Sequence, residues 1–231
     1  MAVAQVLSRA QLGLEAPLVQ IEAHLGSGLP GFSLVGLPAP VVRESRERVR
    51  SALLNSGFEF PPGRITVNLA PVELAKEGGR YDLPVALALL VASGQLELRR
   101  ATVPECYGEL GLDGQLRPVR GLLLAAVHAG RAGHELILPR ANLDEVRLAR
   151  NTRACGFTDL RSVCSYLRSV AETPCDASAT PNDNVSPTIQ ITTLDDVKGQ
   201  WRAKRVLAIA AAGGHSLLML LSNSPYQPGH R

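Results

Sequence analysis

The stretch Lys76-Glu77-Gly78-Gly79-Arg80-Tyr81-Asp82-Leu83-Pro84 runs directly into Val85-Ala86-Leu87-Ala88-Leu89-Leu90-Val91-Ala92. The first part is a polar loop, called loop 76–82 below. The second part is apolar almost all round, which predicts a buried helix. The segment Arg64-Ile65-Thr66-Val67-Asn68-Leu69 just before the loop predicts a strand. A buried helix beside a strand predicts a sheet with helices packed on it, an α/β class of mixed α+β type.

More elements are predicted toward the amino terminus. Within 16–25, apolar residues occupy every second position from 19 onward, which is typical of a half-buried strand. A turn at 26–31 and a second strand at 32–36 follow, and the segment around 6–7 predicts a third strand. Two prolines then open an amphipathic helix over 40–55.

A hairpin is predicted over 107–118, because Asp113-Gly114 is a strong turn signal between two short strands. The rest of this region predicts helices over 121–130, 142–148 and 160–170, and strands over 136–139 and 155–157.

The composition changes at residue 172. Proline, serine, threonine, aspartate and asparagine dominate 172–193, which predicts a flexible linker. The predicted organisation is therefore a domain over 1–171, a linker over 172–193 and a second segment over 194–231. That segment predicts a helix over 201–212, a buried strand over 215–221 and a disordered tail over 222–231.

The positive charge of the chain is almost all arginine. Its 231 residues carry a net charge of +3, and lysine occurs only at Lys76, Lys198 and Lys204. Coding bias explains this pattern, and phosphate contact by arginine is the alternative. No run approaches the roughly 18 apolar residues of a membrane span. The amino terminus lacks a secretory signal, so we expect a cytoplasmic protein with four reduced cysteines.

Two segments that carry basic residues are candidate interaction sites. In loop 76–82, Lys76, Glu77, Arg80 and Asp82 flank the Gly78-Gly79 pair, which is either an anion-binding nest or a charged surface loop. In the helix over 40–55, the candidate phosphate contacts are Arg43, Arg46 and Arg50. The alternative for the helix is a solvated face with Glu44 to Arg48 and Glu47 to Arg50 pairs.

The remaining polar residues give weaker signals. Glu109 and Asp113 near Arg117 and Arg120 suggest acid–base chemistry, with a solvated hairpin as the alternative. His128 and His134 have no companion ligand nearby, so we predict no metal site.

A phosphate-binding loop needs the pattern Gly-x-x-x-x-Gly-Lys-Ser/Thr after a strand. The predicted strand over 215–221 is in the right place, but no lysine follows Lys204. We therefore expect no nucleotide cofactor for this chain.

Several blocks of this sequence together resemble the YifB/ComM-type magnesium-chelatase-like AAA+ ATPases. The blocks are Gly36-Leu37-Pro38, Glu44-Ser45-Arg46-Glu47-Arg48-Val49-Arg50, Asn55-Ser56-Gly57-Phe58, Ile65-Thr66-Val67-Asn68-Leu69-Ala70-Pro71, the Lys76 to Pro84 stretch, Gly108-Glu109-Leu110-Gly111-Leu112-Asp113-Gly114 and Asp196-Val197-Lys198-Gly199-Gln200 through His215.

The resemblance implies a Lon-protease-like amino-terminal domain followed by the start of an AAA+ module. Lon uses a Ser–Lys dyad, whose positions fall near Arg80 and Leu123 here, so the resemblance implies no peptidase activity. Val197, Gly199 and Gln200 match vestigial positions of the nucleotide box.

For full-length relatives the resemblance implies hexameric, ATP- and Mg-dependent motors that act on DNA, with branch migration in natural transformation. This chain departs from the pattern at Leu221, for which a frameshift or truncated gene is the simplest explanation. We expect a non-catalytic member that binds DNA weakly at most. The alternatives are a free-standing regulatory or DNA-binding module and a Lon-like peptidase.

Overall fold

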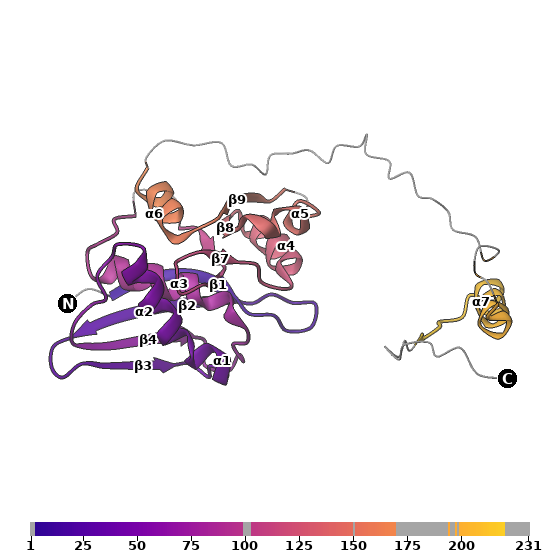
Figure 1. The fold of residues 1–231 in the computed structure, drawn as a ribbon, viewed down its shortest axis with the longest axis horizontal. Coiled ribbons are helices and arrows are strands. Elements are labelled where there is room, and N and C mark those ends of the chain that lie inside the picture. Colours follow the sequence, from indigo (N-terminus) through magenta and orange to yellow (C-terminus); the bar gives the residue numbers. More distant parts are fainter. Residues whose placement is uncertain are drawn as a thin grey trace, which may run out of the picture. The chain divides into compact units, whose positions relative to one another are not determined.

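The computed structural model describes residues 3–98, 103–149, 151–169, 194, 197 and 199–219. The chain divides into two units, residues 1–182 and 183–231, which are described separately below (Figure 1). The predicted linker over 172–193 and the predicted tail over 222–231 lie outside the described residues.

The first unit is built on a mixed sheet of seven strands in the order β3-β4-β2-β1-β5-β8-β9 (Figure 1). Only β2 runs against the other strands of this sheet. The strands are β1 Val3–Arg9, β2 Leu18–Gly26, β3 Gly31–Val35, β4 Arg64–Ala70, β5 Glu105–Cys106, β8 Glu135–Pro139 and β9 Arg153–Phe157. The predicted mixed α/β class is confirmed.

Helices cover the sheet in two groups. The larger core contains residues of α1 Pro40–Arg43, α2 Ser45–Asn55, α3 Asp82–Ala92 and α6 Leu160–Arg168. The smaller core contains residues of α4 Leu122–Ala132 and α5 Leu143–Val146. Along β8, Ile137 belongs to the first core, whereas Leu136 and Leu138 belong to the second. Because neighbouring strand residues point to opposite faces, the two groups lie on opposite faces of the sheet.

Helix α3 is the centre of the larger core. Every residue from Asp82 to Leu90 is buried, and the helix packs on β1 and β2, as the all-apolar sequence predicts. Burial of a leucine side chain contributes about 1.5–3 kcal/mol, and four leucines of α3 are buried. The chain must also pass close to β4 at Gly36, where a Cβ atom would lie 2.1 Å from the carbonyl oxygen of Leu69.

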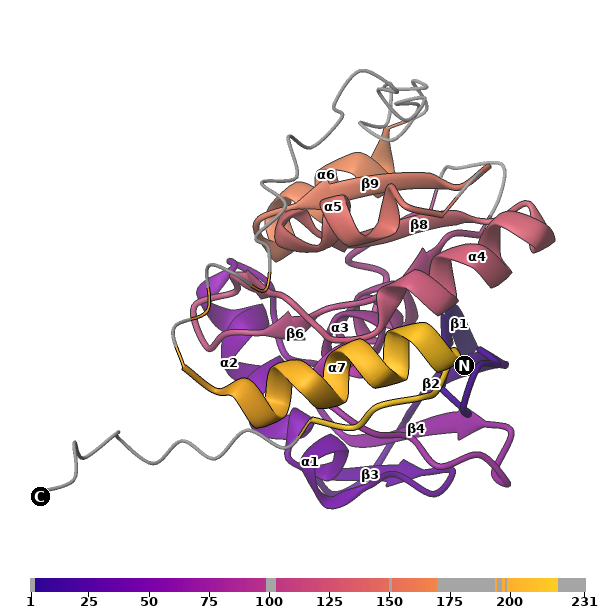
Figure 2. The same cartoon turned by 90° about the vertical axis from the view of Figure 1, so that its right-hand side faces the viewer.

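The short elements connect these layers. A turn of 3-10 helix, η1 Gly79–Tyr81, leads into α3, and η2 Arg140–Asn142 precedes α5. Strands β6 Glu109–Leu110 and β7 Leu116–Arg117 form the predicted hairpin. The predicted helix over 40–55 is interrupted at Glu44, so that α1 and α2 are separate (Figure 2).

Candidate functional site

Loop 76–82 is held against the segment before α1. The N–H of Ala39 donates to the Lys76 carbonyl at 3.0 Å, and the Lys76 N–H faces the carbonyl of Leu37 at 3.5 Å. The Lys76 side chain is fully buried and donates to the carbonyl oxygen of Pro71. Burial lowers the pKa of Lys76. The prediction of Lys76 as an exposed phosphate contact is therefore wrong, because its side chain is buried and its ammonium group donates to Pro71.

Asp82, at the other end of the loop, is a buried structural carboxylate. Its Oδ2 accepts from Arg48 Nε at 2.7 Å and from the Leu110 N–H at 3.2 Å, and its Oδ1 accepts from Arg48 Nη2 at 3.0 Å. Burial raises the pKa of Asp82 despite these partners. The hydrogen bond to Asp82 in turn raises the pKa of Arg48. Asp82 thus joins α2, α3 and β6, which leaves it unavailable to a ligand.

The middle of the loop faces a polar pocket. Gly78 has a φ of 75°, and a Cβ on Gly79 would lie 2.4 Å from Glu109 Oε2, so the pair requires glycine. Arg80 donates from Nη2 to the carbonyl of Arg120 at 2.8 Å. The pocket measures about 380 Å³ and is lined by Gln11, Gly13, Ala75, Glu77, Arg80 and Tyr81.

This pocket includes Arg80, the position near which the Lon resemblance places the serine, but not Leu123, the position near which it places the lysine. None of its lining residues is a serine, threonine, cysteine or lysine. Burial raises the pKa of Tyr81 to about 12, so its hydroxyl stays protonated near neutral pH. The pocket offers one guanidinium and one carboxylate for polar contacts, but its lining holds no activated nucleophile.

The hairpin carboxylates have separate structural roles. Asp113 Oδ1 accepts from the Gln115 N–H at 3.1 Å within the turn. Glu109 lies 3.8 Å from Arg117 as a partly exposed ion pair. These contacts favour the solvated hairpin over the acid–base interpretation.

The three candidate phosphate contacts of α1 and α2 are all exposed. Arg46 has a weak, exposed contact with Glu47 at 3.5 Å. Among the described residues, no carboxylate pairs with Arg43 or Arg50, so the predicted Glu47 to Arg50 pair does not form. The Glu44 to Arg48 pair is confirmed at 3.9 Å, although Asp82 is the closer partner of Arg48.

Two aromatic rings beside these arginines were not anticipated. The Arg46 guanidinium lies 5.9 Å from the centroid of the Phe32 ring, and that of Arg50 lies 4.9 Å from the Phe60 ring. The two ring centroids are 6.5 Å apart. A pocket of about 270 Å³ is lined here by Pro30, Gly31, Phe32, Arg46, Arg50, Phe60, Pro61, Pro62, Gly63 and Ile65. We call it the phenylalanine pocket.

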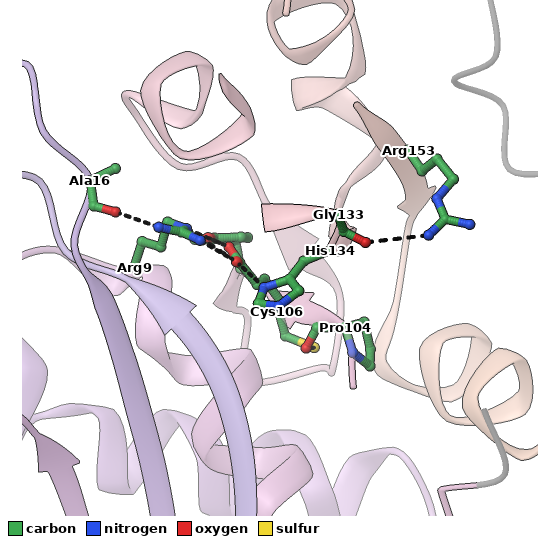
Figure 3. A network of polar contacts seen from close by, with 9 residues as sticks. Arg9, Ala16, Pro104, Cys106, Gly133, His134 and Arg153 are labelled. Carbon is green, nitrogen blue, oxygen red and sulfur yellow. Dashed lines mark hydrogen bonds and ion pairs between the residues drawn. The ribbon is translucent and has the colours of Figure 1, made fainter. Parts of the chain in front are cut away.

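A buried polar network was also not anticipated (Figure 3). Arg9 of β1 donates from Nε and Nη2 to the Glu105 carboxylate of β5, at 2.7–3.1 Å. Glu105 also accepts from the Tyr107 hydroxyl at 2.6 Å and lies 2.7 Å from His134 Nδ1. Arg9 further donates to the carbonyl of Ala16 at 2.8 Å. The network joins β1, β5 and the start of β8.

The prediction that all four cysteines are reduced is wrong, and it fails at Cys155. Cys155 is disulfide-bonded, whereas Cys106 and Cys164 are free and buried. The prediction relied on the lack of a secretory signal at the amino terminus, whereas the geometry of a disulfide requires only that two cysteines be close in the fold. Burial raises the pKa of Cys164 to about 12 and that of Cys106 further still. Both free thiols are therefore unreactive at neutral pH.

Comparison with known proteins follows the same division of the chain. Residues 21–142, more than half of the chain, match the family described as "Subunit ChlI of Mg-chelatase". Residues 193–224 match "Magnesium chelatase, subunit ChlI". The chain is 47% identical over 223 residues to YifB of Escherichia coli and 45% identical over 221 residues to Competence protein ComM of Haemophilus influenzae.

The chain belongs to the YifB/ComM family of magnesium-chelatase-like proteins. Each alignment covers 95% of this chain but 43% of the relative, so the chain spans less than half the length of these relatives. A weaker similarity, 30% over 135 residues, relates 54% of the chain to 16% of the Lon protease of Chloroflexus aurantiacus.

The second unit of this YifB/ComM family member contains the predicted nucleotide-box residues. Val197, Gly199 and Gln200 precede helix α7 Trp201–Gly213, and both Gly199 and Gln200 have left-handed backbones. All three residues are exposed, and α7 buries none of its residues. Residues 215–219 are exposed and form no strand, which corrects the predicted buried strand over its described part. A strand needs a neighbour to pair its N–H and C=O groups, and this segment has no neighbouring strand among the described residues.

Two general features complete the description. No group of three or more potential metal ligands occurs in the part of the chain that the structure describes. Within the same residues, no helix is long and apolar enough to cross a membrane.

Proposed function

We propose that residues 1–171 are a non-catalytic domain that contacts DNA in a DNA-processing member of the YifB/ComM family. The observation that carries this proposal is the group of three exposed arginines, Arg43, Arg46 and Arg50, which nearby carboxylates hardly neutralise. Exposed arginines with little carboxylate charge beside them attract phosphates and release counterions from nucleic acid. The similarity to a competence protein agrees with a role in DNA processing.

The proposal limits DNA binding to a weak, sequence-independent contact. Three arginines supply few phosphate contacts, and the net charge of +3 adds little long-range attraction. We further propose that stronger DNA binding, ATP-driven movement and hexamer formation belong to full-length relatives, and that this chain is cytoplasmic.

The variant R43A/R46A/R50A is expected to lose at least about tenfold of its affinity for single-stranded and duplex DNA at low salt. The reason is that each lost phosphate contact removes a counterion-release contribution. Fluorescence anisotropy with the full 231-residue chain measures this effect. The matched control is Arg131→Ala, which removes an exposed arginine of α4 that forms no ion pair among the described residues. Equal affinity of the triple variant and the unmodified chain would contradict the proposal.

We also propose that this chain neither binds nor hydrolyses ATP. Its 231 residues contain no Gly-x-x-x-x-Gly-Lys-Ser/Thr pattern, and no lysine after Lys204 is present to hold a β- or γ-phosphate. Isothermal titration with Mg-ATP is expected to give no measurable heat of binding. A micromolar dissociation constant would show this part of the proposal to be wrong.

A further inference from the structure

The phenylalanine pocket lies beside the proposed DNA-contacting arginines and has its own chemistry. Phe32 lies on β3, one of the two edge strands of the sheet, and Phe60 lies in the loop between α2 and β4. Both rings are half-buried, with part of each ring open to solvent. The hydrogen bond from the Gly31 N–H to the Gly63 carbonyl, at 3.1 Å, joins the two segments that carry these rings. This bond holds the two segments that carry the rings side by side.

The charges over this pocket are not explained by folding alone. Arg46 and Arg50 are one helical turn apart, an arrangement of like charges that destabilises a helix slightly. Each guanidinium lies over a phenylalanine ring, which offsets this repulsion. Arg50 has no carboxylate partner among the described residues, and Glu47 contacts Arg46 only weakly. The site therefore keeps positive charge beside two aromatic faces.

An aromatic face next to a guanidinium fits one class of ligand especially well. Proteins bind single-stranded nucleic acid by stacking bases on aromatic rings and holding the backbone with positive charge. A pocket of about 270 Å³ accommodates a single base with part of its sugar. A base that is paired within a duplex does not present its face, so the pocket selects unpaired bases.

We infer that the phenylalanine pocket binds one unpaired base of single-stranded nucleic acid, stacked on Phe32 and Phe60. The neighbouring phosphates lie on Arg46 and Arg50. On binding, each arginine exchanges its ring for a phosphate, which frees a ring face for the base. This inference rests on the proposed DNA-contacting function and adds a preference for unpaired strands.

Leucine substitutions at the two rings test the stacking step. Phe32→Leu and Phe60→Leu keep apolar volume but remove the aromatic face. In the full chain, each substitution is expected to weaken binding of a labelled oligothymidylate of about 12 nucleotides by about fivefold or more, since stacking contributes on this scale. Affinity for a duplex of the same length should stay unchanged.

The matched control is Phe58→Leu. The Phe58 ring also has an arginine over it, Arg168 at 6.0 Å, but it does not line the phenylalanine pocket. Its loss should leave oligothymidylate binding unchanged. An equal loss of affinity at all three phenylalanines would overturn the inference, as would unchanged binding by Phe32→Leu and Phe60→Leu.

A second measurement does not depend on variants. An oligonucleotide that contains 5-iododeoxyuridine, irradiated with the unmodified chain, should crosslink to Phe32 or Phe60 in peptide mapping by mass spectrometry. Crosslinks confined to other residues would overturn the inference.

The outcomes distinguish a failure of the proposed DNA-contacting function from a failure of the base pocket. If R43A/R46A/R50A loses DNA binding while the phenylalanine variants retain it, the DNA-contacting function stands and the base pocket does not. If the unmodified chain binds no DNA at low salt, both fail.

Discussion

Arg48→Met is expected to lower the free energy of unfolding by about 3–5 kcal/mol, which is the usual cost of leaving one partner of a buried ion pair alone. Methionine keeps most of the aliphatic volume of Arg48 but removes both hydrogen bonds to Asp82. The Asp82 side chain is 1% exposed and cannot reach water. For a domain of this size the melting temperature should fall by about 6–20 °C, which thermal unfolding followed by circular dichroism measures.

The stability that Arg48→Met loses should depend on pH. The pKa of Asp82 is already raised by burial and should rise further without Arg48. A carboxylate with a raised folded pKa destabilises the fold above that pKa and stops doing so once it is protonated. The deficit of Arg48→Met should therefore shrink as the pH falls through the folded pKa of Asp82. A deficit that is independent of pH would contradict this account.

Glu105→Gln is expected to lower the free energy of unfolding by a similar amount, about 3–5 kcal/mol, because it leaves the Arg9 guanidinium buried without its counter-charge. Glutamine keeps the shape of Glu105, so packing is not the cause. Arg9 and Glu105 are 8% and 0% exposed as side chains, and their pairing bridges β1 and β5. Urea unfolding measures the change.

The control for Glu105→Gln is Glu15→Gln. Glu15 also faces a histidine, His128 at 3.5 Å, but its side chain is 73% exposed. An exposed pair contributes at most about 1 kcal/mol, so this variant should unfold almost like the unmodified chain. A similar decrease in the free energy of unfolding in both variants would contradict this explanation. It would show that burial of the Arg9 and Glu105 pair does not cause the loss of stability.

The local sequence patterns predicted most of the sheet and its central helix. Strand β2 follows from period-two alternation, α3 from its unbroken apolar run, and the hairpin from Asp113-Gly114. Each of these signals lies within a short stretch of the chain. Strand β5 was missed because two residues, Glu105 and Cys106, are too few to show a period.

Contacts between distant parts of the chain could not be predicted in this way. Arg9 and Glu105 are 96 positions apart, and nothing in either local sequence marks them as partners. Lysine is rarely buried, so the sequence favoured an exposed Lys76, whereas in the fold its side chain is buried and donates to the Pro71 carbonyl.

The candidate site was predicted in part. The helical spacing placed Arg46 and Arg50 on one face, and the structure adds Phe32 and Phe60 from two other segments. A basic helix followed by Phe58 and Phe60 was the available signal, but the position of Phe32 depends on the pairing of β3 with β4.

The salt dependence of binding to single-stranded DNA tests the central claim most directly, namely that Arg43, Arg46 and Arg50 contact phosphates. The slope of log Kobs against log salt is about −0.7 per phosphate contact on single strands. R43A/R46A/R50A should therefore show a slope that is shallower by about two than that of the unmodified chain. Identical slopes for the two proteins would contradict the claim, because they would place the phosphate contacts elsewhere.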